Sequence, residues 1–206
     1  AYASRYSQNV RIIPSVIDTS LLFPKEKKEG PFTIGWIGSA SNIPYLEIAK
    51  PAILQFLRQY PEARFILVSS SPGNLFNYDD QRILFRPWSA ETENELINSF
   101  SVGLMPLPDN TYTRGKCSYK MLQYMACGVP VLVSPVGTNT SILKDSGAGL
   151  AATNTDDWLK GLCTFKEDAD LYKHCSEMGP DFIAQNYSVK KFAPVIAERF
   201  YKLTGK

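Results

Sequence analysis

Short apolar runs alternate with longer segments of helical periodicity along most of this chain, and this alternation limits the possible folds more than any other feature. The runs carry β-branched and aromatic residues and end in glycine, proline or small polar residues, which is typical of buried strands. They span residues 31–38, 63–70, 83–88, 101–108, 129–137 and 147–152. Strands separated by helices indicate βα units. We therefore expect an α/β fold with a Rossmann-like, doubly wound, mainly parallel sheet of about six strands and a helical C-terminal tail.

The segments between and after these runs predict the helices. They span residues 43–60, 89–100, 116–127, 139–145, 155–165, 167–186 and 189–204. Pro51 predicts a kink or a broken first segment in the first helix, because proline removes a helical hydrogen bond. Ser89 is the expected N-cap of the second helix. Gly128 is the expected residue just past the third helix, and the residues before that helix, 109–115, are expected to form a polar loop.

The pattern divides the 206 residues into three expected parts. Residues 1–30 predict a linker from a preceding domain, because they look extended, have few expected partners and end in a charged turn. Residues 31–188 predict the Rossmann-like domain, and residues 189–206 predict a C-terminal helix. The chain begins with Ala1 in place of methionine, which is expected of a processed form or of a piece of a longer protein.

Composition disfavours several functional classes. The net charge of +2 is too small to indicate nucleic acid or an anionic membrane as a partner. No apolar run is long enough to span a bilayer and no signal peptide opens the chain, so we expect a cytoplasmic location. A single histidine, His174, and cysteines without C-x-x-C pairing disfavour a structural zinc site and predict reduced thiols. The cysteines are Cys117, Cys127, Cys163 and Cys175.

Positive charge gathers where the third predicted helix begins. Arg114, Lys116 and Lys120 lie at this end, where the helix dipole disfavours cations by up to about 1 kcal/mol at exposed sites. Lys116 and Lys120 are also one turn apart, so their like charges share a face. An anion bound at this end would turn the repulsion into attraction, whereas a solvated basic face is the alternative interpretation.

Backbone groups near these cations support the anion hypothesis. Amides near Cys117 and Ser118 have no partner within a helix that starts here, so they are expected to donate to the anion. Gly115 precedes them in a loop after a strand, which also favours a binding loop. After the first predicted strand, Gly38 and Ser39 open a small polar loop whose amides are expected to approach a phosphate, although a plain βα turn explains the loop equally.

Three further residues are candidates for contacts with a nucleotide. Gln123 lies about two turns after Lys116 and near the same face, within reach of a hydroxyl pair on a sugar or ribose, or simply exposed to solvent. Arg86 and Trp88 close the strand 83–88, where an aromatic ring can flank a base, although Trp88 also fits a core or rim position.

The remaining ionisable residues predict no catalytic set. Glu91, Glu93 and Glu95 are expected to form the solvated face of an amphipathic helix. His174 lies far in sequence from every candidate loop and is expected to be structural. No Ser-His-Asp or Cys-His arrangement can be assembled, so the sequence leaves the catalytic residues unassigned.

The order of several segments resembles a known family. IIPSVID near the start, FTIGWIGS, ILFRPW, SVGLMPLPDN, RGKCSYKMLQYMACGVPVLVSPVG and a late AGL are similar to the C-terminal half of group 1 retaining glycosyltransferases of the GT-B fold. The block 114–137 is the specific part, because the family's hallmark is a helix ending in Ala-Met-Ala-x-Gly-x-Pro-Val-Val. Members usually carry two glutamates around this helix, at the positions that here hold Gly115 and Gln123. The family's usual Arg and Lys in the first strand loop are also absent, and the resemblance implies that Arg114, Lys116 and Lys120 replace them.

The resemblance implies that this chain is the half that binds a nucleotide-sugar donor. No cofactor and no metal are expected, and the nucleoside-diphosphate sugar is the donor substrate. The acceptor would bind mainly to a missing N-terminal domain, which would also provide any peripheral membrane contact, so the fragment alone is expected to be inactive. Residues 189–206 resemble the family's terminal helix, which crosses back to that domain. Its apolar face is expected to be partly uncovered and to allow self-pairing. This face comprises Phe192, Val195, Ile196 and Phe200.

Two other functional classes were weighed against this one. A self-contained α/β nucleotide-binding or regulatory module, of the flavodoxin or receiver type, predicts an acidic cluster or a flavin loop at the strand ends. A phosphosugar epimerase of related fold predicts carboxylates near positions 115 and 123. Neither feature is present, since the loops after the strands are basic or neutral. The base and sugar of the donor, the acceptor and the oligomeric state have no signal in the sequence.

Overall fold

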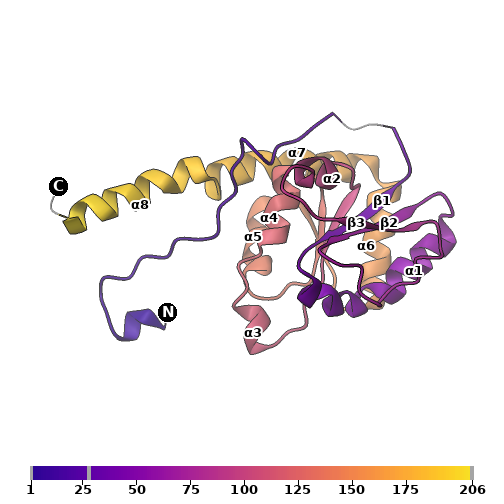
Figure 1. The fold of residues 1–206 in the computed structure, drawn as a ribbon, viewed down its shortest axis with the longest axis horizontal. Helices are drawn as coiled ribbons and strands as arrows, with labels where there is room; N and C mark the ends of the chain where they lie inside the picture. Colours follow the sequence, from indigo (N-terminus) through magenta and orange to yellow (C-terminus); the bar gives the residue numbers. More distant parts are fainter. Residues whose placement is uncertain (1, 27–28, 205–206) are drawn as a thin grey trace.

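A six-stranded parallel sheet forms the centre of the molecule in the computed structural model, which describes residues 2–26 and 29–204 (Figure 1). The strands are β1 (Thr33–Ile37), β2 (Arg64–Ser69), β3 (Ile83–Pro87), β4 (Val102–Met105), β5 (Val131–Val133) and β6 (Gly149–Ala151). Their order across the sheet is β3-β2-β1-β4-β5-β6, and every neighbouring pair is parallel. The α/β, doubly wound fold predicted from the sequence is therefore confirmed.

Helices cover both faces of this sheet. The described chain contains the 3₁₀ helices η1 (Ala3–Arg5) and η2 (Ala40–Ile48), and the α-helices α1 (Lys50–Gln59), α2 (Glu93–Asn98), α3 (Thr111–Arg114), α4 (Tyr119–Ala126), α5 (Thr138–Ser146), α6 (Thr155–Glu167), α7 (Ala169–Asn186) and α8 (Val189–Thr204), of which η1 and α8 extend away from the sheet. One apolar core holds Phe56 of α1 and Trp158 of α6, and a second core holds Met121 of α4 and Ile183 of α7. The four inner strands, β1, β2, β4 and β5, are buried almost throughout, as parallel sheets require, whereas the edge strands β3 and β6 are partly exposed.

Several predicted boundaries are confirmed and others move. Pro51 does break the first helical segment, because the chain runs as 3₁₀ helix up to Ile48 and as α-helix from Lys50. Gly128 follows α4 in a left-handed conformation with φ 65°, which suits its predicted place after the helix end. Ser89, the predicted N-cap, lies before α2, and the N-cap of this helix is Thr92. The Ser89 hydroxyl accepts a hydrogen bond from the Thr92 N–H.

The largest boundary errors concern the segment before α4. Residues 109–115, expected to be a loop, contain the short helix α3, whose N-cap Asn110 forms a capping box with Thr113. The next helix begins at Tyr119 and not at residue 116, because its N-cap Ser118 adopts a left-handed conformation with φ 59°. Lys116 and Cys117 therefore belong to a loop, and only Lys120 lies in the first turn of α4.

The lead-in meets the start of α8 at one short bridge, between Ile17 and Ser188. Ile17 donates its N–H to the Tyr187 carbonyl, and its own carbonyl accepts from Val189 N–H. Ile17 and Leu22 are buried, so the predicted lead-in has core contacts before it reaches β1. From this junction α8 extends away from the sheet (Figure 1) and contacts α7. Residues 1, 27, 28, 205 and 206 of the predicted lead-in and terminal helix lie outside the described residues.

Candidate functional site

A cavity of about 630 Å³ opens where the strand order reverses, beyond the carboxyl ends of β1 and β4. In open parallel sheets this crevice is the usual place for a ligand, and the volume suits a molecule of several hundred daltons. Most of the residues predicted from the sequence line it. These are Gly38, Ser39, Trp88, Gly115, Lys116, Cys117, Ser118, Lys120 and Gln123. Ile37, Asn42, Ser70, Glu93, Met105 and Tyr119 complete the lining.

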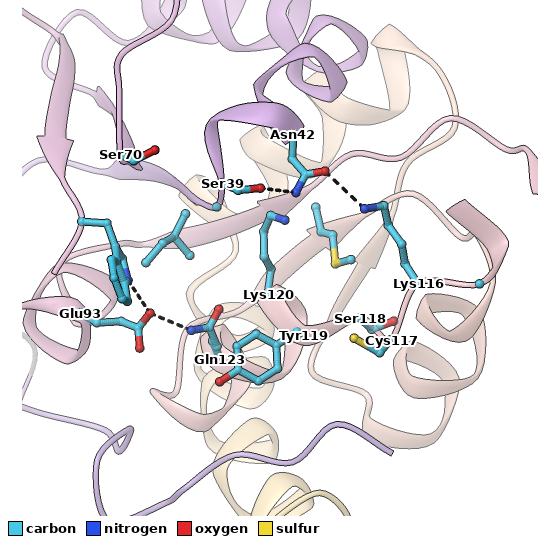
Figure 2. A pocket seen from close by; sticks show the side chains of 15 residues that line it. Ser39, Asn42, Ser70, Glu93, Lys116, Cys117, Ser118, Tyr119, Lys120 and Gln123 are labelled. Carbon is cyan, nitrogen blue, oxygen red and sulfur yellow. Dashed lines mark hydrogen bonds between the residues drawn. The ribbon is translucent and has the colours of Figure 1, made fainter. Parts of the chain in front are cut away.

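Lys116 and Lys120 form the positively charged end of this cavity, and Figure 2 shows their amines extending toward Asn42 and Ser39. The Lys116 amine donates to Asn42 Oδ1 at 3.3 Å and lies 5.0 Å from the Tyr112 ring centroid. The Lys120 amine lies 5.3 Å from the Trp36 ring centroid. Among the residues that the structure describes, no carboxylate forms a salt bridge with either lysine. Two cations thus share a cavity without a neutralising partner.

The buried position of Lys120 makes its positive charge costly. Burial, and then the nearby charge of Lys116, lowers the pKa of Lys120 from 10.5 to about 8, although Cys117 opposes the shift. Aromatic ring faces compensate only in part, since a cation over a ring gains on the order of 1 kcal/mol at such sites. A bound anion would supply the missing negative charge and restore the ordinary protonation of the amine.

A buried polar network fixes the loop that carries Lys116 and Cys117. The Ser118 hydroxyl donates to Asn139 Oδ1 at 2.6 Å, and Asn139 Nδ2 donates to the Ser134 carbonyl. The Thr138 hydroxyl donates to the Lys116 carbonyl at 2.8 Å. These bonds tie the loop to the start of α5 and hold Ser118 in its left-handed conformation, which a non-glycine residue adopts only under such constraint.

The backbone N–H groups of residues 115–118 differ in whether they have an acceptor. The N–H groups of Gly115 and Lys116 already donate to the carbonyls of Tyr112 and Thr113. The N–H groups of Cys117 and Ser118 have no acceptor among the described residues. Ser118 also makes no side-chain cap to α4. The amides predicted to be free are therefore those of Cys117 and Ser118, whereas Gly115 contributes no free N–H.

Gly38 gives Lys120 room beside β1. A Cβ at this position would lie 2.7 Å from Lys120 Cε and 2.8 Å from Trp36 Cη2. Both distances are shorter than side chains tolerate, and Trp36 is buried, so its ring cannot move aside. Gly38 thus lets the loop after β1 approach the lysine closely, which is a different role from the phosphate contact predicted from the sequence.

Trp88, Glu93 and Gln123 form the opposite, polar end of the cavity. The Trp88 indole donates from Nε1 to Glu93 Oε1 at 2.8 Å, and Gln123 donates from Nε2 to the same oxygen at 3.0 Å (Figure 2). Burial raises the pKa of Tyr119, and so does the charge of Glu93, which places the Tyr119 hydroxyl near this carboxylate. Glu93 was predicted to lie on a solvated helix face, and that prediction is wrong.

Glu93 is the pocket residue that the sequence interpretation missed. The helix beginning at Glu93 follows the loop after β3, so its first turn stands at the same sheet edge as the other strand-end loops. This position in the chain was the available signal that Glu93 could line the cavity. Helical periodicity alone separates one face of the helix from the other, and it does not show which residues pack against each face. Glu91, by contrast, lies before the helix and is exposed. Glu95 lies within the helix and is also exposed.

Two predicted site residues lie elsewhere. Arg114 does not line the cavity: its guanidinium pairs with Asp109, with Nε 2.6 Å from Oδ1, and both side chains are exposed. The predicted convergence of three cations is therefore wrong, since only Lys116 and Lys120 meet. Arg86 is exposed on β3, where its Nη1 donates to the Phe85 carbonyl, and it does not line the cavity either.

The described residues contain no group of three or more histidine, cysteine, aspartate or glutamate side chains arranged to hold a metal ion. None of the helices in that part of the chain is long and apolar enough to cross a membrane. The four cysteines, all among the described residues, form no disulfide, and Cys117, which lines the cavity, is exposed.

Comparison with known families identifies the fold and the pocket region. A family model described as "Glycosyl transferases group 1" matches residues 31–168, which contain all six strands and every residue that lines the cavity. The chain belongs to the group 1 glycosyl transferases. The family suggested by the sequence is thereby confirmed. No curated protein matches the chain closely enough to add a more specific assignment.

Several solved structures, including a domain of another group 1 glycosyl transferase, share this fold. The C-terminal domain of a glycosyl transferase group 1 family protein (LpcC) from Francisella tularensis gives a TM-score of 0.66 at 17% identity, over 84% of this chain and 99% of that one. HepE from Anabaena, in complex with UDP and glucose, gives 0.69 at 15% identity, over 90% and 55%. The pneumococcal O-GlcNAc transferase GtfA, in complex with UDP and GlcNAc, gives 0.69 at 15% identity, over 99% and 42%.

This group 1 chain thus spans about half the length of the longer structures that it resembles. At these identities the likeness concerns the fold alone. The domain-sized match to the Francisella protein indicates that the whole of that C-terminal domain has its counterpart here.

Proposed function

We propose that this chain is the donor-binding half of a metal-independent, retaining glycosyltransferase, with a nucleoside-diphosphate sugar bound in the cavity. The observation that carries the proposal is the pair of lysines, Lys116 and Lys120, without a carboxylate partner at the topological switch point. HepE and GtfA are described with UDP bound, which supports a nucleotide ligand for a chain of the same fold.

The diphosphate would bind between the two lysine amines and the free N–H groups of Cys117 and Ser118. Each contact pairs a cation or a backbone donor with a phosphate oxygen, and charge-assisted bonds of this kind are roughly twice as strong as neutral ones. The base and ribose would then extend toward Trp88, at the far end of the cavity. Trp88 has 50% of its surface exposed, which leaves a ring face for stacking.

The same lysines would assist the chemical step. When the bond between the sugar and the diphosphate breaks, negative charge develops on the leaving phosphate oxygen. Lys116 and Lys120 would stabilise that charge electrostatically, which is the role that a metal ion plays in other transferases. The acceptor and the remaining catalytic groups would come from a preceding domain, so the chain alone would bind donor without transferring sugar. A cytoplasmic location is part of the same proposal.

A thermal-shift screen of UDP, GDP and ADP against the chain tests this proposal. A ligand that binds only the native state raises the melting temperature. At a ligand concentration of a hundred times Kd, it adds about 2.7 kcal/mol to the free energy of unfolding. We expect one nucleotide to raise it clearly and its nucleoside without phosphates to raise it little. A melting temperature that none of the three nucleotides changes would contradict the proposal.

Cys117 provides a second readout within the same cavity. Iodoacetamide should alkylate this exposed thiol quickly, and the bound diphosphate should slow the reaction because it covers the neighbouring amide. The buried thiols of Cys127 and Cys175 serve as internal controls that the nucleotide should not affect. Equal alkylation of Cys117 with and without a nucleotide that shifts the melting temperature would place the ligand elsewhere.

A further inference from the structure

The hydrogen-bond ladder between β1 and β4 stops before either strand ends. β1 pairs with β2 along all five of its residues, but with β4 only at Ile34 and Gly35. The bonds of a parallel ladder are evenly spaced, so a continuation of this register would join the Ile37 N–H to the Leu104 carbonyl. β1 extends to Ile37 and β4 to Met105, past the last paired residues. The sheet therefore opens between its two middle strands, where the strand order reverses.

The Tyr124 hydroxyl takes the place of that ladder bond. It accepts a hydrogen bond from the Ile37 N–H at 3.0 Å and donates one to the Leu104 carbonyl at 3.3 Å. The two backbone groups are thus separated by two hydrogen bonds instead of one. Burial raises the pKa of Tyr124, so the phenol keeps the proton that its bond to Leu104 requires.

Close packing holds the Tyr124 ring in this position. The side chain is fully buried. A Cβ at Gly103 would lie 2.4 Å from Tyr124 Cγ and Cδ2, so only glycine leaves room for the ring beside β4. Phe100 packs edge-on against it, with ring centroids 6.2 Å apart. Because such a packed core leaves little space for the ring to withdraw, the hydroxyl is kept between the strands.

The separated strand ends belong to the cavity wall. Ile37 and Met105, the last residues of β1 and β4, both line the cavity. Gly38 follows Ile37, and a Cβ there would lie 2.7 Å from Lys120 Cε. Lys120 stands one turn before Tyr124 on α4. The position of the β1 end relative to α4 therefore sets the space around the lysine amine.

We propose that Tyr124 is a positioning residue whose hydroxyl holds the ends of β1 and β4 apart and thereby sets the spacing between the loop after β1 and Lys120. The inference rests on the proposed function, because the diphosphate is the group that this spacing would accommodate. Tyr124 itself contacts no ligand, since it is fully buried and does not line the cavity.

A tyrosine that only fills the core predicts something different. In that case, loss of the hydroxyl would lower the melting temperature and leave the affinity of the folded chain unchanged. A positioning role predicts that the affinity also falls, at temperatures where the whole population is folded. The affinity measured well below the melting temperature therefore separates the two roles.

Tyr124→Phe provides this test, because it keeps the ring and removes only the hydroxyl. We expect the Ile37 N–H to pair directly with the Leu104 carbonyl and to narrow the cavity. Calorimetry should then show about tenfold weaker binding of the nucleotide that the unaltered chain binds among UDP, GDP and ADP, since a misplacement of about 1 Å can cost about a hundredfold in function. Pyrophosphate should lose affinity by a similar factor, because the change affects the lysine end.

Ile53→Val is the matched control for stability. Ile53 is fully buried in the other apolar core, that of α1 and α6, so its truncation should lower the melting temperature and leave the affinity unchanged. Equal affinities of the unaltered chain and a folded Tyr124→Phe variant would overturn the inference and leave the proposed function standing. If the unaltered chain binds no nucleotide, the proposed function fails and this inference fails with it.

Nuclear magnetic resonance adds a readout that needs no variant. In the unaltered chain, the Ile37 amide proton should show a nuclear Overhauser effect to the Tyr124 ring protons beside the hydroxyl. In Tyr124→Phe the Ile37 amide resonance should shift, because its acceptor changes from a phenol to a carbonyl. The absence of the Overhauser effect, or an Ile37 resonance that the substitution leaves in place, would overturn the inference.

Discussion

The two ends of the cavity differ in whether their charged side chains have partners. At one end Lys116 and Lys120 lie among neutral side chains and aromatic rings, with no described carboxylate to pair with. At the other end Glu93 is already held by two donors, from Trp88 and Gln123. The positive end therefore carries unbalanced charge in the absence of a ligand, whereas the polar end is organised by its own hydrogen bonds.

This difference assigns different tasks to the two ends. Unpaired cations that are partly withdrawn from water gain most when an anion arrives, so the lysine end should provide most of the affinity. A prearranged set of acceptors costs little to organise on binding and discriminates by shape, so the Glu93 end should provide selectivity. Each of the following substitutions should therefore affect one end and spare the other.

The largest effect is expected from removal of both lysines. Lys116→Ala with Lys120→Ala should weaken the binding of a nucleoside diphosphate by about 3 kcal/mol, more than a hundredfold, because two charge-assisted contacts are lost. Calorimetric titration measures this directly. The matched control is Lys190→Ala with Lys191→Ala on the exposed surface of α8, which removes the same charge and should change the affinity little. Comparable losses in both double variants would contradict the assignment of the diphosphate to Lys116 and Lys120.

A smaller effect is expected at the aromatic side of the polar end. Trp88→Ala should weaken the nucleoside diphosphate by about 2 kcal/mol, a typical loss for a base stacked on an aromatic ring. Inorganic pyrophosphate lacks a base, so its affinity should not change. Competition experiments with the two ligands measure both values, and a similar loss for pyrophosphate would mean that the substitution disturbs the lysine end.

Gly38→Ala should destabilise the positive end from within. The added Cβ would meet Trp36 and Lys120, so we expect the free energy of unfolding to fall by about 1–2 kcal/mol. Chemical denaturation gives this value. Gly115→Ala is the control, since a Cβ there lies 3.4 Å from the nearest atom and the backbone φ of −86° suits alanine. A loss of stability at Gly115 as large as that at Gly38 would show that the close approach has no special importance.

The pH dependence of stability and of diphosphate binding should isolate the contribution of Lys120. Its pKa of about 8 in the folded chain lies below the ordinary value of 10.5. The unfolded chain therefore binds more protons between these values, and the contribution of Lys120 to the free energy of unfolding rises with pH across this window. Binding of a diphosphate should reverse the shift and take up a proton. Relative to Lys120→Met, the affinity of the unaltered chain should fall about fourfold from pH 7 to pH 8.5.

Calorimetry in buffers of different ionisation enthalpy detects that proton directly. We expect net uptake at pH 8 in the unaltered chain and less uptake in Lys120→Met. Identical proton uptake in the two proteins would show that the ligand does not contact this amine.

The sequence predicted the sheet well because strand formation here depends on local composition. Each apolar run became a strand close to its predicted position, and Pro51 and Gly128 acted through backbone restrictions that neighbours cannot alter. The resemblance in the block 114–137 also led to the right family, and nine of the eleven predicted site residues line the cavity.

The errors arose where distant contacts decide local structure. Ser118 adopts its left-handed conformation, and delays the start of α4, because Asn139 and Thr138 hold the loop from another helix. Glu93 enters the cavity because Gln123 faces it from α4. For Ser118 and Glu93, no pattern within a single segment contains this information. Arg114 is a different case, because it turns away to pair with Asp109, only five residues earlier in the same segment.

The exposure of α8 has a consequence for local unfolding and for the hydrogen exchange of its amides. Its sixteen residues, Val189–Thr204, include Pro194, and Phe192, Val195 and Ile196 of its predicted apolar face are only half-buried, while Phe200 is exposed. A helix of this length is marginal in water without a packed face. Its amides should therefore exchange hydrogen with solvent through local unwinding, long before those of α4 and the central strands exchange through global unfolding. The same chain would thus report two separate free energies of opening, one for the domain built on the sheet and one for its terminal helix.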